Sequence, residues 1–217
     1  PGDWRTGVDV KILEQKLNED KSHKIKAVFA LHNETSTGVV SNIKKIRQVM
    51  DALKHPALLM VDTISSLGSI DYHHDEWKVD VTVCGSQKGL LLPPGISFNA
   101  ISQKALDAYS RSTMTKSYWD WKPMLENNKS GFFPFTPSTN LILGLDEALE
   151  MLMEEGLENV FKRHTRLAEA TRATVKAWGL EILAKNPDEY SNSITAVLLP
   201  AGHDADNLRS IILNEYN

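Results

Sequence analysis

The 217-residue sequence predicts an α/β fold: a mostly parallel sheet flanked by helices, followed by the start of a smaller C-terminal α/β domain. Two observations carry this prediction. Short, uninterrupted apolar runs, typical of buried strands, alternate with longer segments in which apolar residues recur at intervals of three and four. Strands that alternate with helices are typical of parallel sheets, because a parallel crossover needs a connection about as long as a helix.

Helices are expected where apolar residues share one face of a 3.6-residue repeat. In the clearest case Ile43, Ile46 and Met50 fall on one side of the segment 42–53, and Asp9 can cap an earlier helix. The helices expected in the first half are Val8–Asp20, Asn42–Leu53, a short one near Asp75, and Gln103–Ser112. Strands are expected at the apolar runs Lys26–Leu31, Pro56–Val61, Asp80–Cys84 and Gly95–Ala100.

The second half of the chain changes character. Ser117–Pro137 places aromatic residues among Pro, Asn and Gly, which predicts a long loop of the kind that is functional or lies at an interface. Two long helices are then expected to meet at Gly156, a helix-ending residue. These helices, and the segments predicted to begin a second domain, are Leu141–Glu155, Leu157 to about Trp178, Leu180–Leu183, Ile194–Pro200 and Asp204–Leu213. We therefore divide the chain into 1–156, part of a large domain, and 157–217, an interdomain helix with the start of a small domain.

The composition excludes several classes of protein. The chain is 41% hydrophobic and 24% charged, with a formal net charge of −4, so it has the balance of an ordinary globular protein and no excess of basic residues for nucleic acid. Its apolar runs are too short to cross a membrane, and Pro1–Arg5 does not resemble a signal peptide. The single cysteine, Cys84, cannot form an intrachain disulfide. The first residue is not Met and the last follows a helical pattern directly, so we expect an internal fragment of a longer protein.

Polar residues follow three of the expected strands. His32–Thr35, Asp62 and Ser86–Lys88 each come after the end of an apolar run. In sheets of this kind ligands bind beyond the carboxyl ends of the strands. Three polar clusters at the same edge therefore predict a ligand site there.

Lys88 and Asp62 suggest the chemistry of that site. Lys88 lies between Gly85 and Gly89 after a buried strand, where desolvation favours the neutral amine, a nucleophile toward aldehydes. A carboxylate such as Asp62 can keep a pyridine nitrogen protonated. The two together are the minimum needed to hold pyridoxal 5'-phosphate (PLP) as an electron sink. Each residue alone has an ordinary interpretation, a surface lysine in a turn and a capping aspartate.

Residues around this pair leave alternatives open. Thr35 is a candidate cofactor contact, whereas Ser36 and Thr37 are better explained as helix caps. Ser86 and Gln87 either bind a phosphate or stabilise their own turn.

Two residues farther along the chain are also candidates. Ile64, placed on the same side of an extended chain as Asp62, either packs beneath a flat ring or belongs to the core. Thr136 either caps the next helix or donates to a phosphate. His32 could contact the ring, while His73 and His74 face opposite ways on an extended chain and make poor joint metal ligands, so no metal site is predicted.

Three motifs then match a known family. They are His32–Val39 (HNETSTGV), Leu59–Ser66 (LMVDTISS) and Gly85–Gly89 (GSQKG), supported by Glu154–Asn159, Arg163–His164 and Ala177–Leu180. In this order and spacing they resemble the class V, fold-type I PLP aminotransferases, and within them the branch of serine–glyoxylate and alanine–glyoxylate aminotransferases. The likeness extends over essentially all 217 residues.

The resemblance implies a role for each site residue. Lys88 would be the catalytic Schiff-base lysine, Asp62 the partner of the pyridinium nitrogen, and Ile64 the apolar residue beneath the ring. Thr35 would lie near the phenolic oxygen of the cofactor and Gln87 would contact its phosphate.

The resemblance also implies a homodimer with shared active sites, because the position of Thr136 reaches the phosphate of the neighbouring subunit in relatives. Phe133 stands where some relatives carry a tyrosine with a similar contact. Relatives have a phosphate-cradling turn and a ring-stacking aromatic residue before residue 1, and a carboxylate-binding arginine beyond residue 217. If residues 1–217 were the whole polypeptide, we expect weak PLP binding and negligible turnover.

The implied reaction is transfer of an amino group from L-serine, or alanine, to glyoxylate in two half-reactions. An aspartate–glyoxylate or other class V transaminase remains open, as do, more distantly, a carbon–sulfur lyase and a non-catalytic dimerisation or binding fragment. The partners would be small amino and 2-oxo acids, without nucleic acid or membrane. The expected compartment is the cytoplasm of a bacterium, or the peroxisome of a eukaryote.

Overall fold

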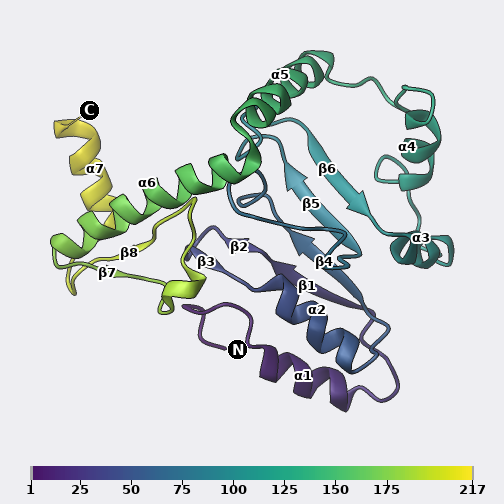
Figure 1. Ribbon diagram of the computed structural model, residues 1–217, viewed down its shortest axis with the longest axis horizontal. Helices are drawn as coiled ribbons and strands as arrows, with labels where there is room; N and C mark the ends of the chain where they lie inside the picture. Colours follow the sequence, from purple (N-terminus) through teal and green to yellow (C-terminus); the bar gives the residue numbers. More distant parts are fainter. Residues whose placement is uncertain (1, 217) are drawn as a thin grey trace.

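A four-stranded sheet forms the centre of the computed structural model, which describes residues 2–216. The strands lie in the order β1 (Ala27–Leu31), β4 (Leu58–Asp62), β5 (Val81–Gly85) and β6 (Ser97–Ile101). The first three are parallel and β6 is antiparallel to β5 (Figure 1). Asp62 pairs with residues of both neighbouring strands, so the carboxyl ends of the parallel strands lie at one edge. The predicted α/β class with a mostly parallel sheet is confirmed.

Two helices, α1 (Val10–Glu19) and α2 (Ile43–Ala52), pack against each other and over β1 and β4. Asp9 caps α1 as predicted, since its carboxylate accepts from the Lys11 and Ile12 amides. The three α2 residues singled out from the sequence are almost fully buried against Leu59 and Val61. Burial of each such side chain stabilises the fold by about 1.5–3 kcal/mol.

The remaining elements extend this unit in two directions. At one end of the sheet lie α3 (Gln103–Ser110) and α4 (Trp121–Asn128), and α5 (Thr139–Glu155) returns across the other end (Figure 1). Gly156 ends α5 with a φ of 78°, which suits glycine, and α6 (Leu157–Ala177) starts directly after it.

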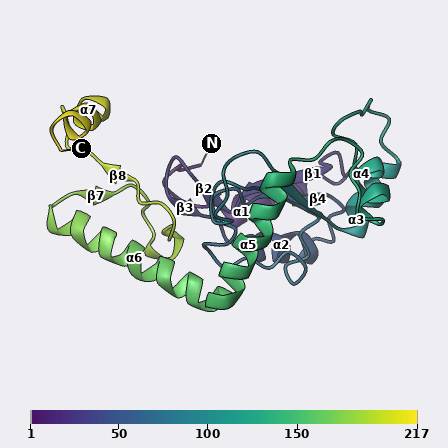
Figure 2. The same cartoon turned by 90° about the horizontal axis from the view of Figure 1, so that it is seen from above.

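The long helix α6 leads away from the sheet to a small C-terminal part (Figure 2). This part holds β7 (Glu181–Ile182), a 3₁₀ turn (Pro187–Glu189), β8 (Val197–Leu198), which is antiparallel to β7, and α7 (Ala205–Glu215). None of the helices between residues 2 and 216 is long and apolar enough to span a lipid bilayer.

Several predicted elements differ from the structure. The helix expected near Asp75 is a single turn, in which the Trp77 amide bonds to the His73 carbonyl and Lys78 then takes a left-handed φ of 47°. The loop expected over 117–137 contains α4, which Asp120 caps by accepting from the Lys122 amide.

Residues 33–40, where no strand is expected from the sequence, form the hairpin β2 (Asn33–Glu34) and β3 (Val39–Val40). The strands expected to start at Pro56 and Gly95 each start two residues later. Proline has no amide hydrogen for the ladder, which accounts for the first delay.

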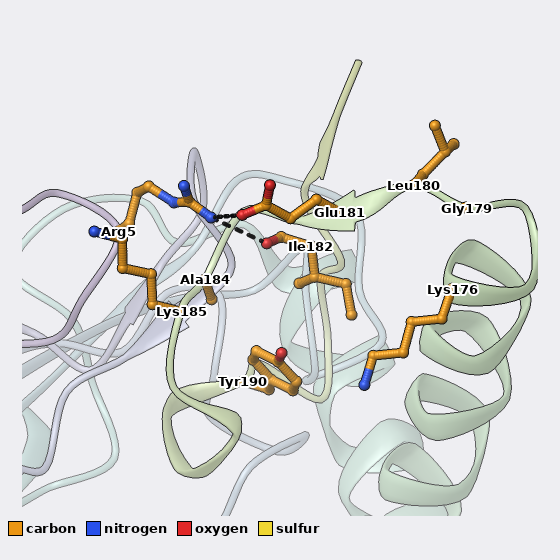
Figure 3. A pocket seen from close by; sticks show the side chains of 9 residues that line it. All are labelled: Arg5, Lys176, Gly179, Leu180, Glu181, Ile182, Ala184, Lys185 and Tyr190. Atoms are coloured by element: carbon orange, nitrogen blue, oxygen red, sulfur yellow. Dashed lines mark hydrogen bonds and ion pairs between the residues drawn. The ribbon is translucent and has the colours of Figure 1, made fainter. Parts of the chain in front are cut away.

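The N-terminal segment holds the C-terminal part in place. Arg5 donates from Nε to the Leu183 carbonyl at 2.6 Å, and its guanidinium pairs with Glu181 and reaches the Ile182 carbonyl (Figure 3). A shallow hollow of about 380 Å³ opens beside these contacts. It is lined by Arg5, Lys176, Gly179, Leu180, Glu181, Ile182, Ala184, Lys185 and Tyr190. The hollow lies away from the strand ends that carry Asp62 and Lys88.

Candidate active site

Asp62 and Lys88 lie on two turns that touch each other. β4 ends at Asp62 and leads into a turn through Ser69, while Lys88 lies in the turn that follows β5. The contact is made at Gly89, where an added Cβ atom would lie 2.1 Å from the Leu67 carbonyl oxygen and 2.7 Å from Ser69 Oγ. Only glycine permits such an approach. The structure therefore places the two predicted residues on adjacent loops at the carboxyl edge of the sheet.

Asp62 is half-buried and has one carboxylate oxygen to spare. Its Oδ1 accepts from the Ile64 amide at 2.8 Å, and no hydrogen bond or ion pair to Oδ2 is found among residues 2–216. Burial and, to a smaller extent, the charge of Asp62 raise the pKa of Cys84 on the adjacent strand. Asp62 is paired with Val83 of β5, the strand after which Lys88 follows.

Lys88 is exposed, because the turn carries it beyond the end of β5. The shielding by the strand that we expected from the sequence is therefore wrong for this chain. Within the described residues Lys88 forms no ion pair. The sheet edge thus carries one cation and one anion without counter-ions, the arrangement expected of groups that bind a third, charged molecule.

The polar residues around the pair separate into two groups. Ser86 is fully buried and donates to the Pro93 carbonyl at 2.7 Å, so it stabilises its own turn. Gln87 is exposed beside Lys88, and Thr35 is exposed in the β2–β3 turn. The helix-cap interpretation of Ser36 and Thr37 is wrong, because Asn42 caps α2.

Ile64 and Thr136 are placed differently from the sequence argument. Ile64 is half-buried in a turn and not on an extended chain, since β4 ends at Asp62. Thr136 lies in an exposed segment before α5, whose N-cap position is Ser138, so Thr136 is not the cap. No hydrogen bond in the described chain joins Thr136 to Asp62 or Lys88.

His32 is a structural residue in this chain. It is 3% exposed, its Nδ1 lies 2.9 Å from Ser66 Oγ, and its ring packs against Tyr72 and Trp77. Burial lowers its pKa to about 4, against a weak opposing effect of Asp71, so the ring is neutral at pH 7.

The adjacent histidines 73 and 74 serve different partners. His73 bonds to Asp71, and His74 Nδ1 lies 2.7 Å from Thr82 Oγ1. In the part of the chain that is described, no three His, Cys, Asp or Glu side chains are grouped closely enough to hold a metal ion.

The residues present fit PLP on their chemistry. An exposed amine can attack its aldehyde, an unpaired carboxylate oxygen can accept from a protonated ring nitrogen, and the hydroxyl of Thr35 and the amide of Gln87 can bond to its oxygens. Sheet topology and donor set together are those expected of the PLP-dependent aminotransferases of fold type I.

Comparison with known proteins identifies the family. The sequence pattern of the family described as aminotransferase class-V matches residues 4–217, so the chain belongs to that family. It is 48% identical over 217 residues to the serine–glyoxylate aminotransferase of Hyphomicrobium methylovorum, covering 99% of this chain and 54% of that protein. It is 45% identical over 214 residues to the L-aspartate–glyoxylate aminotransferase of Paracoccus denitrificans, again over 99% and 54%.

A solved structure agrees with this assignment. The alanine–glyoxylate aminotransferase of Nostoc sp. superposes with a TM-score of 0.87 at 28% identity, over 99% of this chain and 56% of that one. The chain thus spans about half the length of the curated relatives it matches.

Replacement of Gly89 by alanine is expected to separate the two turns. The new methyl group would collide with the Leu67 carbonyl oxygen, which is backbone and cannot rotate away. Overpacking of this kind costs about 1–3 kcal/mol, to be measured as the free energy of unfolding in urea. Gly2→Ala, with nothing within 4 Å of the added atom, is the matched control. Equal stability of the two variants would contradict the close contact.

The buried His32 is expected to make stability depend on pH. Its pKa is lowered from 6.5 to about 4 in the folded chain, so below pH 6.5 the unfolded chain binds a proton that the folded chain does not. Stability should therefore fall as pH drops from 6.5 to 4, by roughly 3 kcal/mol in all, and this loss should level off below pH 4. Urea unfolding over this range should show a shallower dependence for His32→Gln. The exposed-residue control His203→Gln should keep the wild-type slope, and parallel curves for all three proteins would refute the assignment.

Proposed function

We propose that the protein containing this chain is a PLP-dependent aminotransferase that moves an amino group from L-serine, or alanine, to glyoxylate. The observation that carries the proposal is the pair of adjacent turns bearing Asp62 and Lys88, two opposite charges left without counter-ions. The 48% identity to a serine–glyoxylate aminotransferase supports serine as the donor. The 45% identity to an aspartate–glyoxylate enzyme makes aspartate the first alternative.

Each proposed site residue has one task. Lys88 Nζ would hold the cofactor covalently, and its amine would serve as the base that moves a proton at the substrate Cα. The free oxygen of Asp62 would accept from the ring nitrogen and keep that nitrogen protonated. When bound, PLP supplies the electron sink for the negative charge that develops at Cα.

The other three residues fix the orientation of the ring. The Thr35 hydroxyl would donate to the phenolic oxygen, the Gln87 amide would donate to the phosphate, and Ile64 would pack beneath the ring. Exposure of Thr35 and Gln87 and the half-buried position of Ile64 support these roles.

The assembly belongs to the same proposal. Thr136 is exposed and distant from the pair in sequence, which supports a role toward the phosphate of a second subunit in a homodimer. We assign residues 1–156 to the PLP-binding domain and residues 157–217 to an interdomain helix and the start of a small domain, consistent with the course of α6 away from the sheet (Figure 2). The proposed compartment is the cytoplasm, where the free thiol of Cys84 would stay reduced.

Borohydride reduction tests the covalent link. Reduction of the PLP-loaded protein followed by peptide mapping should place the phosphopyridoxyl group on Lys88. The amine of Lys88 is exposed, and its turn after β5 touches the turn that follows Asp62. Lys88→Ala should lose the visible absorbance band of the bound cofactor, while Lys45→Ala, which removes an exposed amine on α2, should keep it. Label on another lysine, or no band with excess PLP, would favour a non-catalytic binding fragment.

Asp62→Asn tests the second half of the pair. The amide keeps the size of the carboxylate but cannot hold a proton on the ring nitrogen, so we expect amino transfer to slow by roughly 100-fold or more, as when one electrostatic contact to developing charge is lost. Steady-state rates of glyoxylate amination measure the effect, with the exposed Asp146→Asn as control. Borohydride should still label Lys88 in the variant. An unchanged rate would remove Asp62 from the mechanism.

A further inference from the structure

The turn that carries Asp62 is held by two consecutive residues after β1. His32 bonds to Ser66, and Asn33 bonds to Ser65 by two reciprocal contacts. In these contacts Asn33 Nδ2 donates to Ser65 Oγ at 2.9 Å, and Ser65 Oγ donates back to the Asn33 carbonyl at 2.9 Å. Asn33 is 4% exposed and Ser65 6%, so both bonds are shielded from water.

A third residue joins this contact from far along the chain. Ser193 Oγ donates to the Ser65 carbonyl at 2.9 Å and accepts from Asn33 Nδ2 at 3.2 Å. Ser193 belongs to the segment that leads into β8. The backbone of this segment is fixed nearby, since the Ser191 amide bonds to the Gly38 carbonyl at 3.0 Å and Arg172 of α6 donates to the Ser191 carbonyl at 2.9 Å.

The geometry connects the C-terminal part to the position of the Asp62 carboxylate. The Asp62 side chain is oriented by the Ile64 amide, one residue before Ser65, so any shift of Ser65 moves the donor that orients the carboxylate. The shift can come from either side, through Asn33 or through Ser193.

We propose that Asn33 is a positioning residue which, together with Ser193, couples the C-terminal part of the chain to the orientation of the Asp62 carboxylate. The inference rests on the proposed function, in which that carboxylate holds the ring nitrogen of PLP. Asn33 does not touch the cofactor; it acts through Ser65 and the Ile64 amide. The Asn33 Oδ1 atom is buried without a partner in the described chain, so the side-chain amide is held only by the hydrogen bonds that Nδ2 donates.

The deciding variant is Ser193→Ala, because Ser193 is exposed and its loss leaves the bonds between Asn33 and Ser65 in place. In the full-length protein we expect faster hydrogen exchange at the Ile64 amide and weaker PLP binding. Each change should be at least roughly 2- to 10-fold, the net contribution of one of the two hydrogen bonds that Ser193 Oγ makes to Asn33 and Ser65. The control is Ser210→Ala, whose hydroxyl bonds only within α7, to the Asp206 carbonyl at 2.8 Å. It should change neither quantity.

A double-mutant cycle shows whether the effect passes through Asp62. Ser193→Ala should weaken PLP binding in the wild-type background and have no further effect in Asp62→Asn, because the oriented group is already lost. Equal effects in the two backgrounds would overturn the inference, since Ser193 would then act on binding by another route.

Failure of the inference is distinguishable from failure of the proposed function. If borohydride does not label Lys88, the proposed function is wrong, but exchange at the Ile64 amide still reports on the coupling without any cofactor. Unchanged exchange in Ser193→Ala relative to Ser210→Ala overturns the inference even where Lys88 is labelled. Faster exchange together with non-additive PLP affinities supports it.

Discussion

The contact between the two turns at Gly89 is the constraint on which the candidate site depends. The parallel register fixes where β4 and β5 end, but it does not fix the paths that the chain takes afterwards. The approach of Gly89 to the Leu67 carbonyl does so, because backbone meets backbone there with no side chain between them. Two groups that the proposed function assigns to opposite parts of one small ring are thereby carried next to two turns in direct contact. Loops alone would not hold them to the tolerance that catalysis needs.

The charges at this edge are arranged against stability. Asp62 and Lys88 have no counter-ions among the described residues, whereas Asp80, at the other end of the same sheet, is buried among several donors. The Leu59 amide, Ser102 and Lys104 all bond to Asp80. Pairing Asp62 in the same way would stabilise the fold and leave nothing to bind a charged ligand. Functional sites commonly forgo such stabilisation.

The sequence predicted the sheet and the sheet edge well, because both follow from local patterns. The apolar runs located every strand of the central sheet to within about two residues. The three polar clusters were expected at one edge because parallel strands end together, and the structure places them there. Asp9 caps the start of α1 because its carboxylate accepts from backbone amides, and Gly156 ends α5 because glycine tolerates a positive φ.

The failures concern contacts between distant segments, which no local pattern reports. Ser36 and Thr37 resemble caps, but the hairpin β2–β3 intervenes and Asn42 caps the helix instead. The burial of His32 depends on Tyr72 and Trp77, forty or more residues later. Gly89 was one sequence feature that could have indicated such a contact. A glycine beside a proposed catalytic lysine suggests that another part of the backbone approaches closely, but the sequence does not show which part.

Asn33 shows why such contacts matter for function. In the sequence it stands inside a family motif without any chemistry of its own, and only the fold brings Ser65 and Ser193 to it, 32 and 160 residues away. Its Oδ1, buried without a partner among residues 2–216, costs about 1–3 kcal/mol relative to a fully bonded group. An apolar residue of similar size would avoid that cost but would lose the donor that links the two serines. The chemical contribution of Asn33 is therefore the connection that it makes, between the turn that orients Asp62 and the segment that leads into the C-terminal part.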